Sequence, residues 1–91
     1  MPSISASKGG HYGCGNCYAL NVQVHDFTTG TYTYSCIDNS GPGGSDTVFF
    51  SHLVAVTDPN QGTWPGVFCD DNAPYSAYVV INGVASNRVQ F

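Results

Sequence analysis

The chain has 91 residues, of which four are cysteine and none is glutamate, and its two cations and six acidic residues give a net charge of −4. This length predicts a single domain over residues 1–91. With only Lys8 and Arg88 positive, the chain lacks the basic stripe that binds nucleic acid, and it has no apolar run of about 18 residues that would insert into a membrane. The cysteine density is typical of a secreted or otherwise extracytoplasmic protein.

Three strand-like patterns occupy the first part of the chain. Residues 3–16 are rich in Ser and Gly, and we expect a short edge strand and then a tight loop. Apolar and polar residues alternate over 18–25 and again over 31–36, which predicts two half-buried strands. A short loop with glycine near its end separates them, so we expect an antiparallel hairpin. After a turn-rich loop at 38–45, residues 47–57 are apolar on both faces, which predicts two short strands or one bent strand.

The remaining residues contain a Pro-rich loop at 58–65, a brief strand at 67–69 and a closing hairpin. Apolar runs on both sides of Asn82-Gly83 predict a type I′ turn. Six to seven short strands with no helix predict an all-β fold, most simply a small two-sheet antiparallel sandwich of immunoglobulin-like type, with a small barrel as the alternative. The expected core is Tyr18, Leu20, Val22, Tyr34, Val48, Phe50, Val54, Phe68, Val80 and Val89.

The closing hairpin from Tyr78 to Val89 resembles that of immunoglobulin-like and fibronectin-III-like domains. Together with Ser7-Lys8-Gly9, the segment from Cys14 to Cys17, and Cys36, it is similar to small extracytoplasmic modules of actinobacterial secreted or membrane-anchored proteins. This resemblance covers most of the chain and implies no particular activity. Cys36 and Cys69 are closer together than the cysteines of a true immunoglobulin domain, and Trp64 lies just before the second of them.

The four cysteines, Cys14, Cys17, Cys36 and Cys69, allow three disulfide connectivities. We favour Cys14 with Cys17 and Cys36 with Cys69. The Cys-x-x-Cys pair could instead exchange disulfides, although a strand pattern follows it where a redox motif would have a helix. A metal site at these cysteines is the third alternative, and the histidines are not spaced to complete one.

Catalytic patterns are weak in this sequence. Its three histidines, at positions 11, 25 and 52, accompany no Gly-x-Ser-x-Gly elbow, and the neighbouring carboxylates of Asp70 and Asp71 point apart on an extended chain. We therefore expect no enzyme and no cofactor. The oxygen-rich segments 38–46 and 70–72 leave calcium as an alternative, although Asp and Asn are also common turn formers.

The remaining signal is aromatic, because Tyr12, Trp64 and Tyr75 fall in loops beside Gly, Pro, Asn and Asp. Flat rings with amide and carboxylate neighbours stack on sugars and also anchor protein interfaces. We therefore expect a binding or accessory module, monomeric and extracellular, that recognises a glycan or a protein. The expected ligand-binding residues are Trp64, Tyr75, Asp70, Asp71 and Asn72. A thiol–disulfide protein acting through Cys14 and Cys17 and a structural spacer domain are the alternatives.

Overall fold

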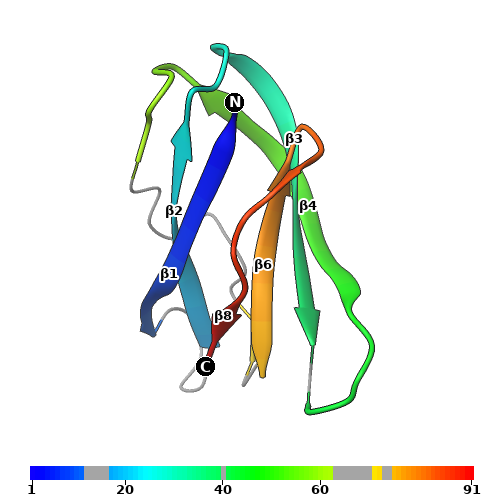
Figure 1. Ribbon diagram of the computed structural model, residues 1–91. Coiled ribbons are helices and arrows are strands. Elements are labelled where there is room, and N and C mark those ends of the chain that lie inside the picture. The colour runs from blue at the N-terminus through cyan, green and yellow to red at the C-terminus, as the bar shows by residue number, and fades with distance from the viewer. Residues whose placement is uncertain (12–16, 40, 63–70, 73–74) are drawn as a thin grey trace.

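The computed structural model describes residues 1–11, 17–39, 41–62, 71–72 and 75–91. The strands of these residues form two antiparallel sheets, with the order β1-β2-β5 in one and β4-β3-β6-β7 in the other, where β8 also pairs with β6 (Figure 1). This confirms the predicted all-β, two-sheet architecture. The described part of the chain holds no helix that could cross a membrane.

Among the described residues, five strands are long and three have only two residues, so their number exceeds the six to seven short strands predicted. The long strands are β1 (Ser3–His11), β2 (Cys17–His25), β3 (Gly30–Asn39), β4 (Thr47–Val56) and β6 (Ser76–Ile81). The short strands are β5 (Asp71–Asn72), β7 (Val84–Ala85) and β8 (Val89–Gln90).

Strand β2 has the alternation predicted from its sequence. Leu20, Val22 and Val24 are buried, whereas Asn21 and Gln23 between them are exposed. β1 pairs antiparallel with β2 along most of its length and forms an edge of the three-stranded sheet. The buried side chains of β2 pack against those of the second sheet and form one core between the two layers.

The predicted hairpin between residues 18–25 and 31–36 is wrong, because β2 and β3 belong to different sheets. The chain leaves β2 at Asp26, which has a left-handed φ of 58°, and then buries Phe27 in the core. The Phe27 N–H donates to the Pro59 carbonyl at 3.0 Å, which holds this crossing segment against the loop that follows β4. The alternation of apolar and polar residues identifies which face of a strand is buried, but it does not identify the strand with which that strand pairs.

Strand β4 is one continuous strand with a register shift, as in the bent-strand alternative. The shift lies where Cys36 and Ile37 of β3 face Phe50 and Val48, so that Phe49 is the extra residue. β4 is the sheet edge beside β3, and the core assignment of two of its residues is wrong: Val48 is 65% exposed and Phe50 is 42% exposed. An edge strand has a neighbour on one side only, which leaves its apolar side chains partly uncovered.

The Asn82-Gly83 turn is confirmed, because both residues have positive φ, 51° and 76°, as a type I′ turn requires. The turn joins β6 to β7, and β8 then continues the return pairing with β6. Within β6, Ser76, Ala77, Val79 and Ile81 are buried, while the predicted core residue Val80 is only half-buried, so the core prediction for this strand is off by one position.

Two of the four cysteines are described, and both are disulfide-bonded. Cys17 begins β2 and Cys36 is fully buried in β3. No cysteine of the described residues is free. Cys14 and Cys69 lie outside these residues, so the pairing stays a prediction.

Candidate functional site

The predicted binding residues are only partly within the described structure. Trp64 and Asp70 lie outside it, as does the core residue Phe68. Asp71 and Asn72 form β5, whose backbone pairs with the start of β2. Tyr75 is 39% exposed at the beginning of the other sheet: its N–H donates to the Asn39 carbonyl at 2.9 Å, and its carbonyl accepts from the Phe91 N–H at 3.1 Å.

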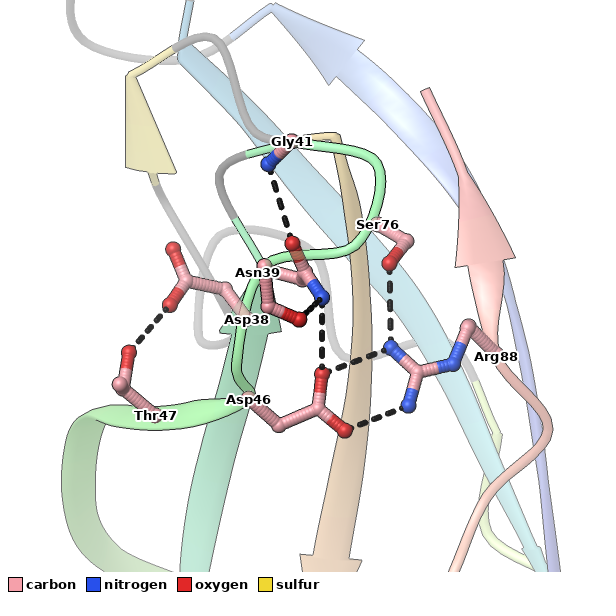
Figure 2. A network of polar contacts seen from close by, with 8 residues as sticks. Asp38, Asn39, Gly41, Asp46, Thr47, Ser76 and Arg88 are labelled. Atoms are coloured by element: carbon pink, nitrogen blue, oxygen red, sulfur yellow. Dashed lines mark hydrogen bonds and ion pairs between the residues drawn. The ribbon is translucent and has the colours of Figure 1, made fainter.

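The oxygen-rich segment 38–46 forms a polar network with the C-terminal segment (Figure 2). The Arg88 guanidinium donates to both carboxylate oxygens of Asp46, at 3.1 and 2.7 Å, and also to the Ser76 hydroxyl at 3.0 Å. The Asn39 side chain accepts from the Gly41 N–H at 3.0 Å and donates to the Gly44 carbonyl at 2.7 Å. Asn39 therefore organises the turn, as its residue type commonly does.

This network has electrostatic consequences for its charged members. The hydrogen bond from Arg88 holds the pKa of the Asp46 carboxyl below its usual range. The same bond raises the pKa of Arg88, whose guanidinium also lies over the Tyr78 ring, 5.0 Å from its centroid. The Asp46 oxygens are thus engaged with a cation, and the described residues contain no cluster of three His, Cys, Asp or Glu that could hold a metal.

The outer face of the three-stranded sheet carries a ladder of uncharged polar side chains, which we call the polar groove. β1 and β2 pair Ser7 with Asn21 and Ser5 with Gln23. Directly paired residues share a face of a sheet, and the residues between them point into the core. The groove has a volume of about 280 Å³, and its lining is Ser5, Ser7, Asn21, Val22 and Gln23.

Two neighbours bound the polar groove. Gly62 bridges to Gln23 from the side of β2 opposite β1, and a Cβ at position 62 would meet the Gln23 side chain at 3.0 Å. A side chain at position 62 would therefore require the Gln23 side chain to shift by a few tenths of an ångström. At one end of the groove, His25 of β2 lies beside it, with its Nε2 at 3.0 Å from the Ser5 hydroxyl in an exposed contact.

The groove offers hydroxyl and amide groups without a formal charge. Asn and Gln side chains each supply both donors and an acceptor, and a serine hydroxyl supplies either role. Such a surface matches ligands that carry many hydroxyl groups, because each ligand hydroxyl also both donates and accepts. The volume of the groove lies just below the usual range of small-ligand sites, about 300–1,000 Å³.

Comparison with protein-family models, with curated proteins and with solved structures found no match to this chain.

Sequence reasoning missed the polar groove, although its signal is present. The residues that alternate with the buried positions of β2 are Asn21, Gln23 and His25, and Ser3, Ser5 and Ser7 alternate in the same way in β1. Each strand alone identifies these positions only as residues on its solvent side. Because β1 and β2 pair in this register, their solvent-facing polar residues lie side by side and form the polar groove.

Proposed function

We propose that this chain is a non-catalytic binding module that works outside the cytoplasm and recognises an uncharged, hydroxyl-rich ligand, that is, a neutral glycan. The observation that carries this proposal is the polar groove. Its paired side chains, from Ser5 to Gln23, offer several hydrogen-bonding groups on one rigid strand pair and no charge that would select an ionic ligand.

The extracytoplasmic part of the proposal is supported by the cysteines. Both described cysteines, Cys17 and Cys36, are disulfide-bonded. Disulfides persist in oxidising compartments and are rare in the cytosol. A position for Cys17 at the start of a strand also favours a structural bridge over the thiol–disulfide alternative, because reactive thiols are typically stabilised at helix N-termini or beside cations.

An immunoglobulin-like fold remains part of the proposal. The order β1-β2-β5 corresponds to strands A, B and E, and β4-β3-β6-β7 corresponds to C′, C, F and G. This correspondence supports the immunoglobulin-like part of the proposal, whereas the resemblance to extracytoplasmic modules of actinobacteria rests on the sequence segments alone. We further propose that the predicted residues Trp64, Asp70, Asp71, Asn72 and Tyr75 contribute aromatic and polar contacts to the ligand, and calcium binding by the acidic ones is a further hypothesis.

Binding to neutral polysaccharides tests the proposal, with a glucan, a mannan and a xylan as probes in isothermal titration. Gln23→Ala removes an exposed amide of the groove, whereas Gln90→Ala removes the same side chain from exposed β8 in the other sheet. Loss of one ligand hydrogen bond is worth about 0.5–1.5 kcal/mol, so Gln23→Ala should weaken binding about two- to twelvefold. Gln90→Ala should bind as the original chain does.

Two results would reject the proposed site. Equal weakening by the two glutamine substitutions would place the ligand elsewhere or indicate a general loss of folding. Absence of binding to all three polysaccharides would leave the spacer domain as the better account.

A further inference from the structure

The outer edge of the five-stranded sheet, formed by β4, differs from the edges of the other sheet. The Asn87 side chain bonds to both backbone groups of Ala6 in β1, at 2.8 and 2.9 Å. The far side of β2 is covered by the segment after β4, where Val24 N–H donates to the Gln61 carbonyl at 2.9 Å. β4 has β3 on one side and, within the described residues, no strand on the other.

The edge has one of the usual protections, the bulge at Phe49, and lacks two others. Residues 47–57 contain neither a charged residue nor a proline, the devices that commonly keep edge strands apart. Four large apolar side chains are exposed along it: Val48 at 65%, Phe49 at 44%, Phe50 at 42% and Leu53 at 61%. Asp46, which precedes the edge, is already paired with Arg88.

The backbone of β4 can accept another strand. Leu53 N–H donates to Nδ1 of the adjacent His52 at 2.8 Å, so it points away from β3. Inward and outward backbone groups alternate in an antiparallel strand, and Ser51 and Ala55 therefore share the outward orientation of Leu53. The edge presents a row of three residues, and an incoming carbonyl would replace the His52 ring at the centre of this row.

We propose that two copies of this chain pair through β4, antiparallel, about a two-fold axis at Leu53. This register uses the whole outward row, because Ser51 of each copy faces Ala55 of the other and the two Leu53 side chains face each other. It also places Phe50 opposite Val56 on the other face of the joined sheet. No charged side chain enters the paired segment, so the net charge of −4 on each copy opposes pairing only at longer range.

The size of the surface indicates a weak dimer. With about 150–200 Å² for each fully exposed side chain, the four apolar residues leave about 320–420 Å² uncovered per copy. Two copies would bury at most about 640–850 Å² of this surface, below the roughly 1,200 Å² at which stable interfaces begin. The pairing is therefore concentration-dependent, and dilute chain is the monomer that the sequence predicted.

Sedimentation equilibrium from about 10 µM to about 1 mM tests this proposal, a range suited to weak association. Leu53→Lys places two cations opposite each other at the axis and should weaken dimerisation at least about tenfold, because like charges directly opposite destabilise a strand pair. Ala85→Lys adds the same charge at an exposed position of β7, at the other end of the same sheet, and should leave the dimer unchanged.

A mixing experiment makes the test specific for the register. Equal amounts of Leu53→Lys and Leu53→Asp should recover association, because opposite charges then meet at the axis. Circular dichroism should show that all three variants fold, since both substituted positions are exposed. A chain that stays monomeric at every concentration overturns the proposal and leaves the edge to a different partner. Dimerisation that Leu53→Lys does not weaken, or that mixing does not recover, overturns it as well.

Discussion

The Asn87 side chain joins the C-terminal segment to β1 and so connects the two sheets. Its Oδ1 accepts from the Ala6 N–H at 2.8 Å and its Nδ2 donates to the Ala6 carbonyl at 2.9 Å. Asn87→Ala removes both bonds and leaves the two backbone groups to water. Each hydrogen bond contributes about 0.5–1.5 kcal/mol, and because Asn87 is exposed we take the low end for both, a total of about 1 kcal/mol. In a domain of this size that lowers Tm by about 4–8 °C.

Urea and thermal unfolding followed by circular dichroism measure this change. Asn21→Ala is the control, because Asn21 is also an exposed asparagine, here in β2, and it should change the free energy of unfolding by no more than about 0.5 kcal/mol. Asn87→Asp keeps the acceptor for the Ala6 N–H but sets a carboxylate against the Ala6 carbonyl, so it should be at least as unstable as Asn87→Ala. If Asn87→Ala unfolds no earlier than Asn21→Ala, the connection between sheets is not a stabilising one.

Two further predictions concern the turn and the charged network. Gly83 has a φ of 76° and open space where a Cβ would lie, so Gly83→Ala should lower the free energy of unfolding by about 1–2 kcal/mol through backbone strain alone, as measured by urea unfolding. Gly10 is equally open but has no positive φ, so Gly10→Ala should not lower the free energy of unfolding. Because the pKa of Asp46 is lower in the folded chain than in the unfolded chain, its ionised carboxylate stabilises the fold fully above about pH 4, the usual pKa of a carboxyl group. This contribution is lost as the pH falls through the lowered pKa of the folded chain. The stability difference between the original chain and Asp46→Asn should therefore disappear in acid; a difference that grows below pH 4 would contradict the assignment.

Local patterns in the sequence predicted local structure well. The alternation from residue 18 to 25 identified β2 and its buried face, and Asn82-Gly83 identified the closing turn, because each depends on neighbouring residues only. Pairing between strands depends on the layers of the fold, which no local pattern contains, and the hairpin predicted between β2 and β3 failed for this reason.

Where a strand is apolar at every position, its sequence does not show which of its two faces is buried. Residues 78–81 are apolar at every position, so the sequence could not distinguish burial of Val80 from burial of Val79 and Ile81. Val48 and Phe50 look like core residues by type and became exposed because β4 is an edge. The polar groove could not be predicted for a related reason. Its residues come from two strands, and the register that places Ser5 opposite Gln23 exists only in the folded sheet.

An amide NMR titration of the oxidised chain with neutral polysaccharides tests the central claim most directly. The account predicts that the largest shifts fall on Ser5, Ser7, Asn21 and Gln23 of the polar groove, and that acidic polysaccharides of similar length shift them less, because the groove carries no charge to attract them. Shifts confined to other surfaces, or a stronger response to the acidic polymers, would contradict a neutral glycan site in this groove.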